Sequence, residues 1–173
     1  MSCYEWTEAI VFALIMLVTV FSVFLRVVNV DGTSMLPNLQ EGDKVLLTSG
    51  PYTPTRGDVI VINHQTSADE PIIKRVIATP GQTVDIDPQN GEVLVDGVTL
   101  DEHRYLPDSV NTALPDDAIQ FPVQVQQGQL FVMGDNRPVS LDSRSSQIGC
   151  IDEKDVLGQA HIVFYPFSHF KRI

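Results

Sequence analysis

Ser34 is the first of two residues in this sequence that combine a reactive side chain with an unusual setting. It lies in the stretch Gly32–Pro37, where glycine permits a tight bend and proline can neither continue a helix nor donate to a sheet. A serine held on such a bend can present its hydroxyl as a nucleophile. The same residue types also make ordinary turns, so a serine that only satisfies its own loop is the alternative interpretation.

Lys74 is the second such residue. It lies in the run Pro71–Ile77, where strict alternation places it on the same face as Ile72 and Val76. Lysine acts as a base only when neutral, which requires burial to lower its pKa from about 10.4 to roughly 7 or 8. Because no histidine and aspartate are placed to form a triad, a Ser–Lys pair is the candidate chemistry. The alternative is an edge strand with a solvated lysine.

Short apolar runs bounded by turn residues predict the strands that would hold this pair. Such runs occur at 44–47, 59–62, 71–77, 129–133 and 158–165, with shorter candidates at 83–86 and 92–95. Since no helical pattern follows the N-terminal apolar run, the sequence predicts an all-β domain over 31–173. Residues 82–128, which are rich in Asp, Gln, Pro and Asn, are expected to form a β insertion or cap.

The N-terminal segment is apolar from Ala9 to Leu25, apart from Thr19 and Ser22. With Arg26 snorkelling the run reaches Val28, about 30 Å of helix, and predicts one transmembrane anchor within residues 1–30. The alternatives are a cleavable signal peptide and a buried core helix. The flanks lack the basic start and the small-residue cleavage site of a signal peptide, which favours a retained anchor.

Composition excludes several classes of function. The formal net charge of −11 leaves no basic stripe for nucleic acid, so we expect no nucleic-acid partner. Two cysteines and four scattered histidines give no metal-ligand spacing, and we expect no metal. These residues are Cys3, Cys150, His64, His103, His161 and His169.

A charged run, GDNRPVSLDSR, follows the expected strand at 129–133. Its Asp and Arg side chains most simply form a charged turn. Alternatively, an aspartate and an arginine pair to hold the loop that carries Ser140. Neither interpretation makes a carboxylate catalytic.

Four stretches together resemble the successive motifs of bacterial type I signal peptidases, in the single-span form typical of Gram-positive organisms. They are GTSMLPNL, RGDVIV, IIKRVIATPGQ and GDNRPVSLDSR, in this order behind one N-terminal span. The resemblance implies a Ser34 nucleophile, a Lys74 general base and an acyl-enzyme. It also implies further roles: Ser140 orients the lysine, Asp142 and Arg144 form a structural ion pair, and Met35 and Pro37 shape the substrate cleft.

The same resemblance implies a β-rich fold that needs no cofactor and rests on membrane lipid. Its substrates would be secretory preproteins with small residues at the first and third positions before the cut. The catalytic domain of a single-pass protein of the cell membrane would then lie on the extracytoplasmic face, near the secretion translocon. Counting basic residues points the other way, because only Arg26 flanks the span and Glu5 and Glu8 precede it.

This sequence departs from the family pattern at several positions. Gly32 stands where some members carry a hydroxyl that helps bind the oxyanion, so backbone N–H groups, including that of Ser34, must serve. Ala78, Gln82 and the pair Pro138-Val139 also differ, which affects loop geometry and substrate preference. A self-cleaving repressor would share the Ser–Lys chemistry, but its N-terminus should be a basic DNA-binding domain, whereas this sequence begins with an apolar span. An anchored β module without activity is the remaining alternative.

Overall fold

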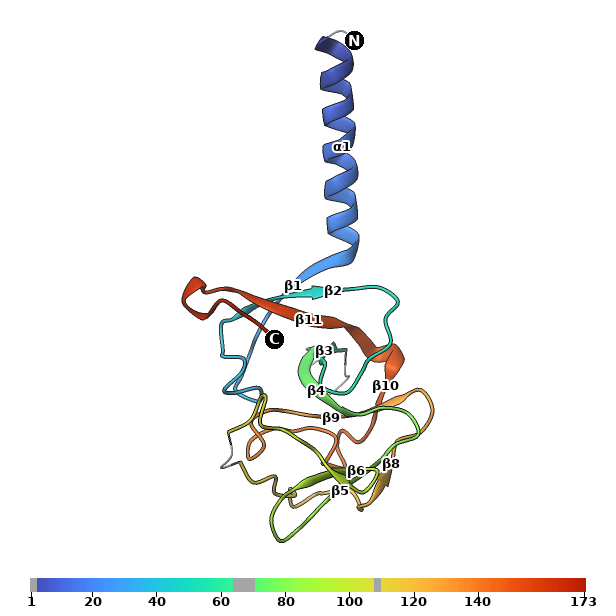
Figure 1. Ribbon diagram of the computed structural model, residues 1–173, viewed down its shortest axis with the longest axis vertical. Helices are drawn as coiled ribbons and strands as arrows, with labels where there is room; N and C mark the ends of the chain where they lie inside the picture. The colour runs from blue at the N-terminus through green and yellow to red at the C-terminus, as the bar shows by residue number, and fades with distance from the viewer. Residues whose placement is uncertain (1–2, 64–70, 108–109) are drawn as a thin grey trace.

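The computed structural model describes residues 3–63, 71–107 and 110–173, in which one α-helix projects from a body of antiparallel strands (Figure 1). The helix is α1 (Cys3–Phe24). The larger sheet contains β1 (Leu25–Asn29), β2 (Lys44–Thr48), β3 (Val59–Ile62), β4 (Ile72–Ala78), β9 (Gln129–Met133), β10 (Ile151–Asp152), β11 (Val156–Tyr165) and β12 (Lys171–Arg172). The smaller sheet contains β5 (Thr83–Ile86), β6 (Val93–Val95), β7 (Val98–Thr99) and β8 (Val123–Gln124), and two 3-10 turns are η1 (Glu153–Asp155) and η2 (Phe167–His169).

The mostly β architecture confirms the expected fold class. The runs at 59–62, 83–86 and 129–133 are strands over the expected residues, and the other expected strands shift by at most two residues at an end. These runs are short, apolar and rich in β-branched residues, which pack well on a pleated surface. His64 lies outside the described residues.

The N-terminal helix is shorter than expected. The sequence predicted helix as far as Val28, but α1 ends at Phe24 and the next five residues form β1. β1 pairs antiparallel with β2, with Val28 opposite Val45, and Ser49 N donates to Phe24 O at 2.8 Å. Pairing with a strand twenty residues away thus overrides the local apolar pattern, which cannot distinguish a helix from a strand over so few residues.

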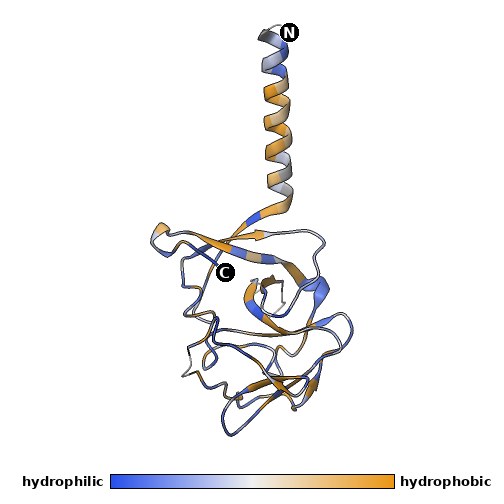
Figure 2. Cartoon of the chain, in the orientation of Figure 1, coloured by the Kyte–Doolittle hydropathy of each residue, from blue (hydrophilic) through white to orange (hydrophobic). Residues whose placement is uncertain are grey.

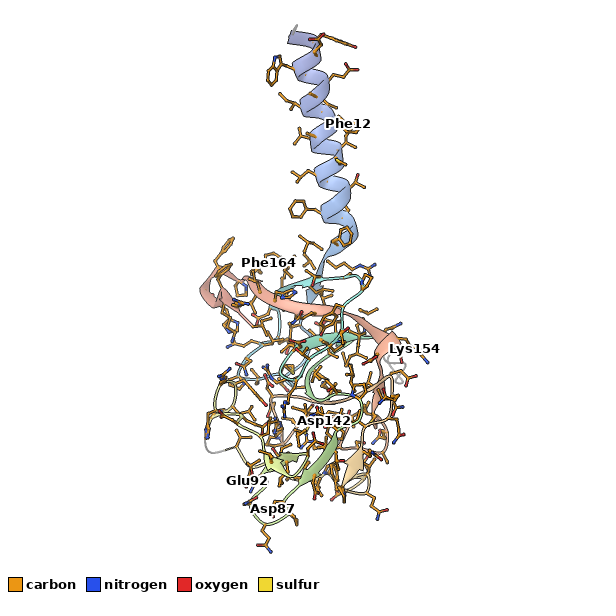
Figure 3. All side chains as sticks on the ribbon, turned by 45° about the vertical axis from the view of Figure 1, so that its right-hand side comes forward. Phe12, Asp87, Glu92, Asp142, Lys154 and Phe164 are labelled. Atoms are coloured by element: carbon orange, nitrogen blue, oxygen red, sulfur yellow. The ribbon has the colours of Figure 1, made fainter. Side chains whose placement is uncertain are left out.

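Within the described part of the chain, no helix is both long enough and apolar enough to cross a bilayer. The transmembrane anchor therefore stays a prediction. The middle of α1 is nevertheless coloured as hydrophobic in Figure 2, and Phe12, labelled in Figure 3, is 68% exposed. The alternative of a buried core helix is wrong for α1, because its apolar side chains lie outside the core.

β4 is an interior strand of the larger sheet. The strand order β1-β2-β11-β3-β4-β9-β10 places it between β3 and β9, and Lys74 lies directly opposite Ile60. The edge-strand interpretation of Lys74 is therefore wrong. The lysine is held in a strand whose neighbours on both sides are fixed.

The region expected to be an insertion forms the smaller sheet, in the order β7-β6-β5-β8. Its inner side chains share a core cluster with the ends of β4 and β9. This cluster includes Val84, Val95, Ile77, Phe131 and Met133, all buried. The smaller sheet is thereby joined through apolar packing to the strands that carry the site.

Candidate active site

The segment that carries Ser34 is fixed at both ends. Val30 N donates to Asp43 O at 2.8 Å and Gly42 N donates to Val30 O at 2.9 Å, closing the loop between β1 and β2. Gly32 has φ of +83°, a left-handed conformation that suits glycine. Met35, next to Ser34, is buried in the core. The half-buried Ser34 is therefore presented on a short loop anchored by its buried neighbour.

Lys74 contacts Ser34 directly. Its Nζ donates to Ser34 Oγ at 2.9 Å, and the lysine is only 4% exposed. Burial lowers the pKa of Lys74 from 10.5 to about 8; the charges of Asp142 and Asp135 oppose this shift, and Arg144 adds to it. At pH 7 about one molecule in ten therefore carries the neutral amine that can accept a proton.

Asp142 and Arg144 form a buried, bidentate ion pair. Arg144 Nε donates to Asp142 Oδ1 at 2.8 Å and Arg144 Nη2 donates to Oδ2 at 2.9 Å. Arg144 also binds the carbonyl oxygens of Arg137 and Ala113, and Asp142 Oδ2 accepts from Gly134 N at 3.0 Å. The pair thus holds both ends of the loop 134–144.

The loop 134–144 also touches the Ser34 segment through backbone atoms. Asn136 N donates to Ser34 O at 2.9 Å, and Asn136 Nδ2 donates to Thr33 O at 3.0 Å. Gly134 makes the close approach possible, because a Cβ at this position would lie 2.5 Å from Ser34 O and would collide with Ser140 Oγ. The two loops are therefore held together at Ser34.

Ser140 is brought beside this junction but not into a hydrogen bond with Lys74. Its Oγ is buried and has no hydrogen-bond partner in the part of the chain that the structure describes. The amine of Lys74 instead contacts Ser34. Burying a hydroxyl without a hydrogen-bond partner costs folding free energy. The Ser140 hydroxyl beside Ser34 and Lys74 can therefore still donate and accept a hydrogen bond.

A cleft of about 480 Å³ opens beside Ser34 and Lys74. One wall is formed by the end of β1 and the residues that follow it, and the other by the start of β4, including Ile72 and Ile73. Of the two residues expected to shape a substrate cleft, Met35 lines it. Pro37 is exposed and lies outside the lining.

Sequence reasoning missed a second buried ion pair, Arg75 with Asp135. Arg75 Nε and Nη2 donate to the two Asp135 oxygens at 2.8 and 2.7 Å. Asn38 Nδ2 donates both to Asp135 Oδ2 at 2.8 Å and to Tyr105 O at 2.6 Å, and the Arg75 guanidinium lies 4.1 Å from the Tyr105 ring centre. An arginine beside Lys74 in an otherwise apolar strand was the available signal.

The region 82–128 contributes a further contact to the loop. Buried Arg137 forms an ion pair with Glu102, with Nη1 donating to Glu102 Oε2 at 2.9 Å, and Nη1 also donates to Thr112 Oγ1 at 2.6 Å. The insertion is thus tied to the site by Tyr105 and Glu102. Its sequence alone gave no chemistry that would reveal this.

The chain is similar to known proteins over nearly its whole length. The family model described as "Signal peptidase, peptidase S26" matches residues 3–165. The chain is 33% identical to "Signal peptidase I" of Bacillus licheniformis over 99% of this chain and 93% of that protein, and 33% identical to "Signal peptidase I S" of Bacillus subtilis (strain 168) over 99% and 94%. A crystal structure of a signal peptidase I from Enterococcus faecalis V583 is 30% identical, with a TM-score of 0.48, covering 64% of this chain and 98% of that one.

The family match includes all three segments that meet at the site: the Ser34 loop, the Lys74 strand and the loop held by Asp142. Since it extends over nearly the whole sequence, the chain belongs to the signal peptidase family, peptidase S26.

Proposed function

We propose that this chain removes signal peptides from secreted preproteins, with Ser34 as nucleophile and Lys74 as general base. One observation carries the proposal: the 2.9 Å contact between Lys74 Nζ and Ser34 Oγ, made by a buried lysine whose pKa is lowered to about 8. In its neutral form the amine accepts the hydroxyl proton across the same contact. Geometry and protonation thus favour the same pair.

In the proposed first step, Ser34 Oγ attacks the carbonyl carbon of the scissile peptide bond and its proton passes to Lys74 Nζ. The tetrahedral intermediate then collapses: the C–N bond breaks and Lys74 gives the proton to the leaving amine. The acyl-enzyme ester remains on Ser34. In the second step Lys74 takes a proton from water, which attacks the ester carbonyl carbon. The bond from that carbon to Ser34 Oγ then breaks, Lys74 returns the proton to Oγ, and the signal peptide leaves with a free carboxyl group.

The oxyanion is proposed to bind to backbone N–H groups, that of Ser34 among them. The position two residues before the nucleophile is Gly32, which offers no hydroxyl. The Asn136 bond to Ser34 O fixes the peptide plane on the far side of Ser34. A donor held in place before the reaction stabilises developing negative charge without reorganising.

Ser140 is proposed to orient Lys74 once Ser34 Oγ is acylated and no longer available to the amine. Its buried hydroxyl has an unused donor and an unused acceptor. A neutral hydroxyl positions the amine without adding charge, whereas a carboxylate would raise the lysine pKa.

The 480 Å³ cleft is proposed to hold the residues before the cut as an extended strand, along β1 on one side and β4 on the other. Met35 forms part of its floor and Pro37 shapes the exit of the loop. Small side chains at the first and third positions before the cut would allow the substrate backbone to approach Ser34 closely.

We further propose that α1 attaches the chain to the cell membrane, with the sheets on the extracytoplasmic face near lipid and the secretion translocon. Exposed aromatic side chains support attachment at the end of β11 as well: Tyr165, Phe167 and Phe170 are 49%, 81% and 63% exposed. A single span would place the site on the extracytoplasmic face, where secreted preproteins emerge from the membrane. Protease added to intact protoplasts should digest the sheets; protection until lysis would contradict this orientation.

The catalytic proposal is tested with the full chain in detergent and a preprotein that carries an Ala-x-Ala site. Ser34→Ala should abolish cleavage and leave the folded state intact, because it removes one hydroxyl and opens little cavity. Ser146→Ala, at an exposed serine, is the matched control and should cleave normally. Substantial cleavage by Ser34→Ala would refute the nucleophile.

A further inference from the structure

A second cleft, of about 610 Å³, adjoins the Ser34 segment and gathers positive charge. We call it the cationic cleft; its charged lining residues are Arg56, Arg75, Arg104, Lys171 and Arg172, with Asp101 as the one acidic side chain of the lining. The chain has eleven lysines and arginines in total and a net charge of −11. Five of the eleven cations therefore meet at one cleft of an acidic protein.

Most of these cations form no ion pair within the described residues. Arg75 is neutralised by Asp135. Within the part of the chain that the structure describes, the side chains of Arg56, Arg104, Lys171 and Arg172 form no ion pair with an acidic side chain. Four like charges in one cleft repel each other. The same positive charges attract an anionic ligand, and its binding would relieve the repulsion.

The cationic cleft also has a free strand edge. β12, which carries Lys171 and Arg172, pairs with β11, and no described strand pairs with its other side. An extended polypeptide can add to such an edge by backbone hydrogen bonds while its side chains meet those of the cleft. The cleft is too large, and its cations come from too many segments, to suit one phosphate group.

The cationic cleft is lined by residues that follow the catalytic pair closely in the sequence, although it shares no lining residue with the 480 Å³ cleft. Asn38, four residues after Ser34, lines it, and so does Arg75, the residue after Lys74. The 480 Å³ cleft lies at Ser34 and Lys74 themselves and takes the residues before the cut.

We propose that the cationic cleft binds an acidic segment of the substrate polypeptide downstream of the cleaved bond. This inference rests on the proposed function, because it assigns a second contact to the same substrate. Its location favours polypeptide over lipid: in Figure 1 the C-terminal strand ends beneath β11, on the side away from α1. Complementary charge at this cleft would raise the effective affinity for substrates with acidic mature chains.

The test compares two peptides with the same residues up to the cut, one followed by a segment containing three glutamates and one by a neutral segment. For the wild-type chain in detergent, kcat/KM should be about three- to tenfold higher for the acidic peptide, mainly through a lower KM, and 1 M NaCl should remove the difference. In Arg104→Gln/Arg172→Gln the ratio should fall to about one, and Asp101→Asn should raise it. Lys154→Gln, at an exposed cation outside the cleft, should keep the wild-type ratio.

The outcomes separate the two proposals. If neither peptide is cleaved, the proposed function fails. If both are cleaved with a ratio near one in the wild type, or if the double variant keeps the wild-type ratio, the cationic cleft is not a substrate site. Competition by inorganic phosphate or anionic vesicles, lost in the double variant, without any effect of the peptide's charge, would overturn the proposal in favour of a phosphate or lipid ligand.

Discussion

Lys74 and Arg75 are consecutive in β4, yet among the described residues Arg75 has a carboxylate partner and Lys74 has none. Side chains alternate along a strand, so the two cations leave it on opposite faces. Arg75 meets the carboxylate of Asp135 at 2.7 Å, whereas Lys74 meets the neutral hydroxyl of Ser34 at 2.9 Å. Because Asp135 is already occupied by arginine, its charge acts on Lys74 only from a distance. The lysine pKa can then fall by burial.

The first prediction concerns the pH dependence of cleavage. Since the amine must be neutral to act, kcat/KM should rise as pH increases through about 8, the pKa of Lys74, and level off above it. Lys74→Arg should lose at least about a hundredfold in rate at every pH, because guanidinium stays charged. A rate that is constant from pH 6 to pH 9 would contradict the lysine as base.

The second prediction concerns stability. The folded-state pKa of Lys74 lies below its value of 10.5 in the unfolded chain, so the ammonium costs stability below about pH 8, and the cost shrinks as pH rises from 8 to 10.5. Lys74→Met should therefore raise the free energy of unfolding at pH 7 by about 3 kcal/mol. The gain should diminish towards pH 10 in urea titrations. A gain that does not change with pH would indicate a packing effect instead.

The third prediction tests the approach of the two loops. Gly134→Ala places a methyl group against Ser34 O and Ser140, and should cost about 1–3 kcal/mol of stability together with most of the activity. Gly42→Ala is the matched control, because its φ of +85° strains the backbone but nothing lies within 4 Å. It should lower stability and keep activity. Equal activities in the two variants would show that the junction does not position the nucleophile.

The fourth prediction separates a positioning role of Ser140 from a structural one. Ser140→Ala should lower kcat at least about tenfold and shift the pH profile, while the free energy of unfolding stays equal or rises by about 1 kcal/mol, since the buried hydroxyl has no partner to lose. Ser140→Thr keeps a hydroxyl and should recover part of kcat. Ser49→Ala, at another buried hydroxyl that has no partner among the described residues, should leave kcat unchanged.

Local patterns predicted the elements that hold the reactive pair, but not how the pair is supported. β3, β5 and β9 match the expected runs, because apolar strands between turns carry their signal in consecutive residues. Alternation also placed Lys74 among Ile and Val. By contrast, β1 was assigned to the helix, since its strand character depends on β2.

The network of Asn38, Arg75, Tyr105 and Asp135 was not predicted for the same physical reason. Asn38, Tyr105 and Asp135 lie far apart in the sequence and are ordinary in their own surroundings, and Arg75, although unusual in an apolar strand, does not indicate its partners. Only the folded sheet brings them together. The role of the insertion in holding Arg75 and Arg137 therefore required the structure.

The strand order also determines the point in synthesis and folding at which this hydrolase could become active. Ser34 and Lys74 are forty residues apart, and the lysine reaches its place only when β4 lies between β3 and β9, a strand that is made more than fifty residues later. Contacts of such long range form late in folding. A nascent chain that has exposed both residues therefore still lacks the dry surroundings that make the amine basic at neutral pH. For the proposed pair of Ser34 and Lys74, the topology would keep the nascent chain inactive, as a removable propeptide does in other proteases.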